Sequence, residues 1–221
     1  MHGPVERRQI TLALGAHTVG CAHADRWPLE VLEELLGQRL LAELRFRRGL
    51  TYAPWAYNYN VFQRDSGYFA AQVTVADRHE EWARDTLLGE IDELTQAAPK
   101  RREVRSAARL VWANWAAADE NNAERAATLA DPILDWPADQ APPDIEAELA
   151  AVTPADIHRV VRAYFVPERR FLGRHTPIFA LDNLVAGFED RLQDAKRLAL
   201  LGLGAAAVHL IWQRLARPGK Q

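Results

Sequence analysis

The feature that most constrains the fold is an apolar helical pattern that stops at a glycine and is followed at once by an aromatic strand. Leucine and valine recur every three or four positions between residues 29 and 44, as in an amphipathic helix. Gly49 follows, and glycine readily takes the left-handed conformation that ends a helix. Residues 51–62 are then rich in tyrosine, as strands are. The stretch LRFRRGLTY, residues 44–52, therefore predicts a sharp corner between a helix and a strand.

Both ends of this helical pattern carry further signals. Asp25 is a suitable N-cap, and Pro28 falls in the first turn, where proline is tolerated. Gly37 interrupts the apolar pattern before Leu40 resumes it. We therefore expect two consecutive helices with a break at the glycine.

Other segments alternate between apolar and polar residues and predict strands. Residues 9–15 place Ile10, Leu12 and Leu14 on one side. Residues 51–62 and 68–75, joined by the turn RDSG, predict an antiparallel hairpin. Pro54 cannot donate to a neighbouring strand, so it favours an edge strand or a bulge.

Helices fill most of the remaining sequence. Asp77 is a suitable cap for a helix over residues 79–96, and Pro99 begins a helical tract that reaches about residue 134, with a break near residues 119–122. Thr153, Pro154 and Asp156 form a strong helix start, and residues 169–175 predict a closing strand. This order predicts an α+β fold, a two-layer sandwich of a mainly antiparallel sheet with helices on one face.

Composition excludes several classes of protein. The net charge is only -3 and is spread along the chain, which argues against a nucleic-acid-binding protein. Cys21 is the single cysteine, so no internal disulfide can form. The first 25 residues lack the pattern of a secretory signal, and we expect a cytoplasmic protein or a periplasmic one without disulfides, unless the C-terminal tail anchors it.

No complete catalytic or metal-binding motif is present. Neither H-x-x-E-H nor H-E-x-x-H occurs, and His79-Glu80 is followed by Ala83 where a second histidine would be needed. His17, Cys21 and His23 lie close together, but no fourth zinc ligand accompanies them. The sequence also lacks G-x-S-x-G, P-loop and dinucleotide-binding patterns. We therefore predict that this chain holds no metal or cofactor and is not catalytic alone.

Three segments together resemble the insulinase, pitrilysin and mitochondrial processing peptidase family of zinc peptidases. RQITLALG is similar to the strand that opens the second half of these enzymes. VLEELLGQRLLAELRFRRGLTYAPWAYN is similar to their helix, loop, second helix with L-R-x-x-x-G-L-x-Y, and strand, although the loop is shorter here. LAAVTPADIHRVVRAYF is similar to their V-T-x-x-D-I helix. The resemblance covers about residues 8–176 and concerns the C-terminal, non-catalytic half.

The resemblance implies a function and two site residues. In this family two homologous halves enclose a peptide-binding chamber, and the zinc-binding motif lies in the other half. Arg45 and Tyr52 fall where the second half carries an arginine and a tyrosine that hydrogen-bond the carbonyl under attack. The resemblance thus implies substrate-binding roles for both, a zinc-bearing homologous half as partner, and a peptide as substrate. From local sequence alone, Arg45 would be a solvated helix residue and Tyr52 a sheet residue.

The C-terminal tail, residues 177–221, lies beyond the resemblance, so we divide the chain into a domain over residues 1–176 and this tail. Residues 198–212 are apolar on all sides and are flanked by lysine and arginine. As a helix, these 15 residues would span about 22 Å, short of a hydrocarbon core of about 30 Å. Snorkelling basic side chains extend that reach, so the tail predicts a single membrane anchor, and the alternative is a helix packed on protein.

Two functions remain open from the sequence. The first is the non-catalytic half of an insulinase-type metallopeptidase, which closes the peptide chamber and helps to position substrate for a zinc-bearing half. The second is a membrane-tethered binding or scaffold module with the same fold and no role in proteolysis.

Overall fold

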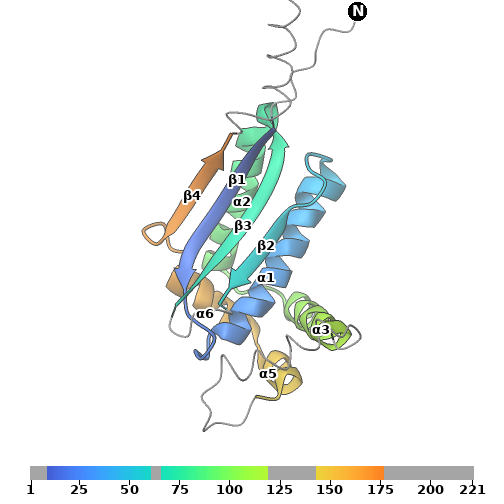
Figure 1. Cartoon of the computed structure of the whole chain (residues 1–221), viewed down its shortest axis with the longest axis vertical. Coiled ribbons are helices and arrows are strands. Elements are labelled where there is room, and N and C mark those ends of the chain that lie inside the picture. Colours follow the sequence, from blue (N-terminus) through green and yellow to red (C-terminus); the bar gives the residue numbers. More distant parts are fainter. Residues whose placement is uncertain (1–8, 61–65, 119–142, 177–221) are drawn as a thin grey trace, which may run out of the picture. The chain divides into compact units, whose positions relative to one another are not determined.

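The computed structural model describes residues 9–60, 66–118 and 143–176 (Figure 1). Its elements, in chain order, are β1 Gln9–Thr18, α1 Arg26–Leu40, η1 Leu41–Arg47, β2 Trp55–Tyr59, β3 Gly67–Ala76, η2 Asp77–His79, α2 Glu80–Gln96, α3 Arg101–Ala118, α5 Ile145–Ala151, α6 Pro154–Tyr164 and β4 Arg170–His175. The predicted α+β fold is confirmed.

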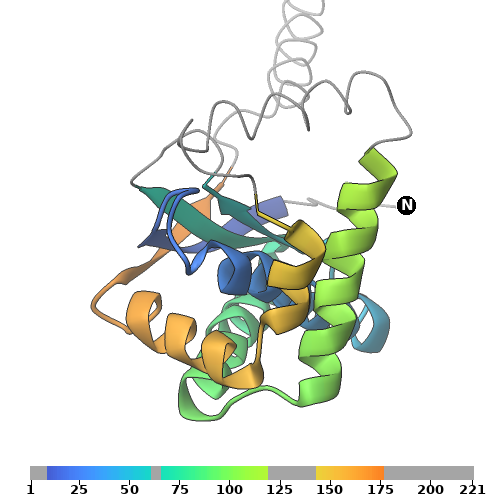
Figure 2. The same ribbon diagram turned by 90° about the horizontal axis from the view of Figure 1, so that it is seen from below.

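The four strands form one antiparallel sheet in the order β2-β3-β1-β4. The predicted hairpin is confirmed, because β2 and β3 pair antiparallel with Tyr57 opposite Ala70. Pro54 precedes β2, which lies at the edge of the sheet as the proline indicated. Figure 2 shows the described helices gathered on one side of the sheet.

The core lies between the sheet and the helices. Ile10, Leu12 and Leu14 of β1 are buried, as the alternation predicted. The rings of Phe69 on β3 and Phe165, just after α6, meet edge to face with centroids 5.1 Å apart. Since both are fully buried, this contact joins the sheet to the last helix.

The predicted break at Gly37 is wrong. Helix α1 runs through Gly37 to Leu40, and the π-helix η1 continues it to Arg47. Leu36, Leu40 and Leu44 are all fully buried, so a single continuous rod keeps the whole apolar stripe against the core. A glycine inside a helix costs only about 1 kcal/mol, which this burial outweighs.

Two predicted caps have different outcomes. Thr153 caps α6 in a complete capping box with Asp156, as predicted. Asp25 occupies the N-cap position of α1, but its side chain does not cap the helix. Its carboxylate instead accepts a hydrogen bond from the Tyr164 hydroxyl at 2.7 Å and pairs with Arg159 at 2.7 Å. Asp25 therefore ties the start of α1 to α6.

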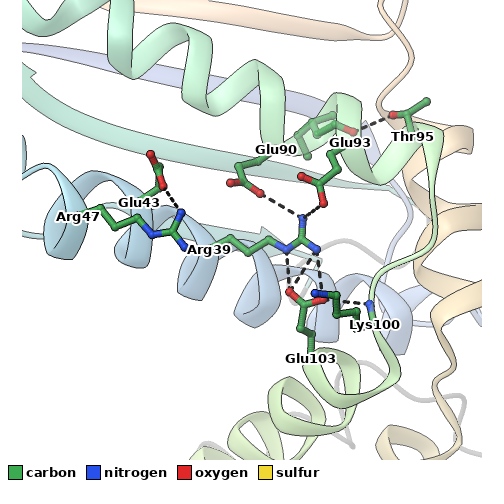
Figure 3. A network of polar contacts seen from close by, with 9 residues as sticks. Arg39, Glu43, Arg47, Glu90, Glu93, Thr95, Lys100 and Glu103 are labelled. Carbon is green, nitrogen blue, oxygen red and sulfur yellow. Dashed lines mark hydrogen bonds and ion pairs between the residues drawn. The ribbon is translucent and has the colours of Figure 1, made fainter.

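Three helices meet at one arginine. The Arg39 guanidinium, at the end of α1, contacts carboxylates of Glu90 and Glu93 on α2 and Glu103 on α3, each at 3.2 Å (Figure 3). Only 15% of the Arg39 side chain is exposed. The four side chains also line a surface cavity of about 340 Å³ between the three helices.

Replacing Arg39 with Met is expected to lower the free energy of unfolding by about 2 kcal/mol, because three carboxylates lose their counter-charge in a partly buried place. Urea denaturation at neutral pH measures the effect. The matched control is Arg47→Met, since the Arg47 side chain is 76% exposed and, among the described residues, pairs with Glu43 alone. The control should change stability by less than about 0.5 kcal/mol. Equal effects of the two substitutions would contradict the special role of Arg39.

The tail, residues 177–221, lies outside the described residues, as do residues 119–142 near the predicted break. Among the residues that are described, no helix is both long and apolar enough to cross a membrane. The predicted anchor at residues 198–212 thus stays a prediction.

Candidate functional site

The corner predicted from the sequence brings Arg45 and Tyr52 together. Arg45 lies in η1, and Gly49 ends the helix with a φ of 63°, the left-handed conformation expected of it. The turn closes through hydrogen bonds from the Gly49 and Leu50 amides to the carbonyls of Arg45 and Leu44, at 2.9 and 2.8 Å. The reversed chain returns Tyr52 to Arg45, whose guanidinium carbon lies 4.5 Å from the centre of the tyrosine ring.

The three arginines of the corner differ in their partners. Arg47 and Arg48 donate to the Glu43 carboxylate at 2.9 and 2.7 Å. These bonds hold the pKa of Glu43 below its usual value. Within the described ranges, by contrast, no carboxylate lies within ion-pair distance of Arg45. The guanidinium of Arg45 instead lies over the ring of Tyr52, and the Tyr52 side chain is 80% exposed.

This arrangement can act as a hydrogen-bond donor site. A guanidinium stacked on an aromatic ring is held in orientation while its N–H groups stay available. The exposed Tyr52 side chain carries a phenol O–H beside them. Together they could donate to one oxygen atom, such as a carbonyl oxygen that gains negative charge.

A partly buried acidic pair, Glu30 and Glu33, supports the strand that follows the corner. The Glu33 carboxylate on α1 accepts a hydrogen bond from the backbone amide of Asn58 on β2, at 2.9 Å. Burial, aided by the nearby charge of Glu30, raises the pKa of Glu33 to about 8. Burial also raises the pKa of Glu30. Glu33 thus accepts from a backbone amide of the edge strand β2 that does not pair with β3. Another chain could otherwise pair with this amide.

The residues considered for a metal do not assemble into a site. Within the described ranges, no group of three or more histidine, cysteine, aspartate or glutamate side chains could hold a metal ion. Cys21 is buried, whereas His23 points outward and its Nδ1 accepts from the Asp25 amide at 3.0 Å. Glu80 pairs with Arg174 of β4 at 2.6 Å, which is a structural contact.

The sequence analysis missed a group of aromatic side chains that lie together on β2 and β3. Trp55, Tyr57 and Tyr59 alternate along β2, and Tyr68 lies opposite Tyr59 on β3. The rings of Tyr59 and Tyr68 stack with centroids 5.1 Å apart. The signal was the period-two spacing of aromatic residues on β2, read only as a property of a strand.

Comparison with known proteins gives a family and a fold. The model of the peptidase M16 inactive domain matches residues 2–111. No curated protein matches the chain.

Solved structures share the fold at low identity. A protease from Helicobacter pylori is 18% identical with a TM-score of 0.67, and the match covers 79% of this chain and 42% of that one. The peptidase M16 inactive domain from Pseudomonas fluorescens is 18% identical with a TM-score of 0.62, covering 76% and 40%. The inactive peptidase domain of a protein from Bordetella parapertussis is 16% identical with a TM-score of 0.62, covering 78% and 93%.

The chain therefore spans less than half the length of the first two of these structures. The family match and the shared fold agree with the resemblance seen in the three sequence segments. Through residues 2–111 the chain belongs to the M16, or insulinase-type, peptidase family, as its inactive C-terminal half.

Proposed function

We propose that this domain closes a peptide-binding chamber together with a homologous zinc-bearing half and positions the peptide for cleavage. The observation that carries the proposal is the pair formed by Arg45 and Tyr52. The arginine has no carboxylate partner among the described residues, and the tyrosine is largely exposed, so both donors are available to a substrate. The family of the domain supports a partner half that carries the metal.

The contribution of this chain is electrostatic. As a peptide carbonyl is attacked, its oxygen gains negative charge, and fixed donors aimed at that oxygen lower the barrier. A guanidinium supplies a permanent charge with a rigid donor geometry, and a phenol supplies a single directed donor. The metal and the attacking water would belong to the other half, because no three ligand side chains come together among the described residues of this chain.

A co-purification experiment tests the proposal. The tagged chain is isolated from the cells that produce it, and the proteins bound to it are identified by mass spectrometry. The purified complex is then assayed with a quenched fluorescent peptide, with and without a chelator. We expect a partner that contains H-x-x-E-H and chelator-sensitive cleavage. A stable complex that lacks such a partner and cleaves no peptide would contradict the proposal and favour a scaffold role.

The chain alone is expected to bind no zinc stoichiometrically and to cleave no peptide, because its sequence contains neither zinc-peptidase motif. Metal analysis after chelator treatment and return of zinc measures this. About one tightly held zinc ion per chain would refute the prediction and direct attention to His17, Cys21 and His23.

A further inference from the structure

The contact between Arg45 and Tyr52 is too weak to hold the two side chains in place by itself. The guanidinium carbon lies 4.5 Å from the ring centre, and the Tyr52 side chain is exposed. A cation–π contact at an exposed site is comparable with thermal energy. A site that acts on a reacting group needs its donors held within about 0.5 Å of the productive geometry. Other residues must therefore fix the corner that carries this pair.

Thr51 fixes the end of the corner that carries Tyr52. Its hydroxyl donates to the backbone carbonyl of Thr74 on β3 at 2.8 Å, in a partly buried place. The ladder between β2 and β3 reaches only to the pair of Trp55 and Gln72, so this hydrogen bond extends the contact with β3 beyond the ladder. Because Thr51 immediately precedes Tyr52, the bond fixes the backbone from which the tyrosine ring projects.

Arg48 fixes the other end of the corner against helix α2. Its guanidinium carbon lies 4.2 Å from the centre of the Trp82 ring on α2. Its Nε donates to the Glu43 carboxylate on η1 at 2.7 Å. A guanidinium can stack and donate at the same time, so one side chain makes both contacts. Arg48 thus joins the end of η1 to α2.

The residues between these two ties are also held in place. The turn is closed by the backbone hydrogen bonds of Gly49 and Leu50 described above, and the Leu50 side chain packs against the core. The segment from residue 48 to residue 51 is therefore tied to α2 at one end and to β3 at the other. Arg45 and Tyr52 lie on either side of this tied segment.

We propose that Thr51 and Arg48 are positioning residues, which hold the ring of Tyr52 over the guanidinium of Arg45. Thr51 acts through its bond to the carbonyl on β3, and Arg48 acts through its stack on Trp82. Neither side chain belongs to the buried core, so loss of either tie should let the pair separate while the fold remains. The consequence for catalysis rests on the proposed function, whereas the positioning itself does not.

Fluorine NMR of the full chain without any partner half tests the positioning. The chain has five tyrosines, so labelling with meta-fluorotyrosine gives few resonances, and Tyr52→Phe identifies the resonance of Tyr52. The shift of this resonance between wild type and Arg45→Lys measures the contact of the pair. We expect Thr51→Val, which keeps the shape of threonine and lacks the hydroxyl, to cause about half of this shift or more. Thr51→Ser keeps the donor and should stay close to wild type.

Trp82 supplies a second, independent set of variants. Trp82→Ala removes the ring beneath Arg48 and should shift the Tyr52 resonance in the same direction as Arg45→Lys. Trp82→Phe keeps an aromatic ring and should stay close to wild type. The matched control is Arg84→Ala, two positions further along α2, because the ion pairs of Arg84 lie within α2 itself. The control should leave the resonance unchanged, and thermal melts confirm that the variants fold.

Kinetics of the reconstituted peptidase pair measure the consequence for catalysis. Thr51→Val and Trp82→Ala should each lower kcat about 3- to 30-fold with little change in KM, since displaced donors lose stabilisation of the transition state. Thr51→Ser and Trp82→Phe should lower kcat less than about twofold. A merely structural role predicts instead that any loss of activity follows the melting temperature.

Three outcomes would overturn the inference. A Tyr52 resonance that is the same in wild type and Arg45→Lys would show that the pair is not held together. A wild-type resonance in Thr51→Val, or in Trp82→Ala, would overturn the role of Thr51 or of Arg48. An active pair with unchanged kcat in variants whose resonance has shifted would show that this geometry does not matter for cleavage. A pair that cleaves no peptide contradicts the proposed function alone, because the resonances are measured without it.

Discussion

Replacing Tyr52 with Phe is expected to lower kcat of the reconstituted peptidase pair by about 10- to 1000-fold. The substitution keeps the ring on which Arg45 rests and removes only the phenol donor. A donor that meets charge only as the carbonyl is attacked acts on the transition state, so kcat should fall more than KM rises. The ring is 80% exposed, so the melting temperature should stay that of the wild type.

Arg45→Lys should lower kcat over the same range, because lysine keeps the charge but loses the rigid donor geometry and the stacking. The matched control is Arg47→Lys, two residues further along η1, where the guanidinium already pairs with Glu43. That variant should keep nearly full activity. Steady-state kinetics of the three variants, with melting temperatures measured alongside, separate the roles. Full activity of both Tyr52→Phe and Arg45→Lys would show that Arg45 and Tyr52 have no role in catalysis and only form the turn between η1 and β2.

Features set by neighbouring residues could be predicted from the sequence. The capping box at Thr153 and the left-handed Gly49 each depend on residues a few positions apart, and both are present in the structure. The strands were likewise visible, because alternation along one strand reflects burial on one face. Even β2, found to begin only at Trp55, has its start marked by Pro54.

Features that need distant partners could not be predicted. Arg39 reaches Glu103, 64 positions away, and Asp25 reaches Tyr164, 139 positions away. Asp25 has the residue type of a cap, but its carboxylate instead binds the partly buried Tyr164 and Arg159, both on α6. Helix α1 likewise continues through Gly37 because residues on both sides of the glycine pack against the same core. The local sequence pattern holds no information on that packing. The group of aromatic side chains shared by β2 and β3 appears only once the strand register is known.

The stability of the chain should fall as pH rises from about 5 to 8, and Glu33→Gln should remove much of this loss. The folded-state pKa of Glu33 is about 8, against a usual value of 4.5. Between these values the folded state keeps a proton that the unfolded state has released. The slope of the free energy of unfolding against pH is proportional to the protons bound by the unfolded state minus those bound by the folded state. That difference is negative in this window, so stability decreases with rising pH. The stability is fully present below pH 4.5 and lost as pH approaches 8.

Glutamine keeps an acceptor oxygen for the Asn58 amide and carries no proton to lose. The variant should match the wild type near pH 5 and exceed its free energy of unfolding by roughly 3–5 kcal/mol near pH 8. Urea denaturation at pH 5, 6, 7 and 8 measures the difference between the two proteins, which cancels the titration of histidines shared by both. The control is Glu34→Gln on the next position of α1, whose carboxylate accepts from Gln38 at 2.9 Å.

Glu34→Gln should leave the pH slope close to that of the wild type, because Glu34 contributes only a small part of the field at Glu33. If wild type and Glu33→Gln stay parallel from pH 5 to 8, Glu33 is ionised in the folded state throughout and its burial is weaker than the structure indicates. If the slopes diverge as expected, the edge of β2 is held by a protonated acid at neutral pH. The edge strand β2 would then loosen in alkaline solution in the wild type but not in Glu33→Gln.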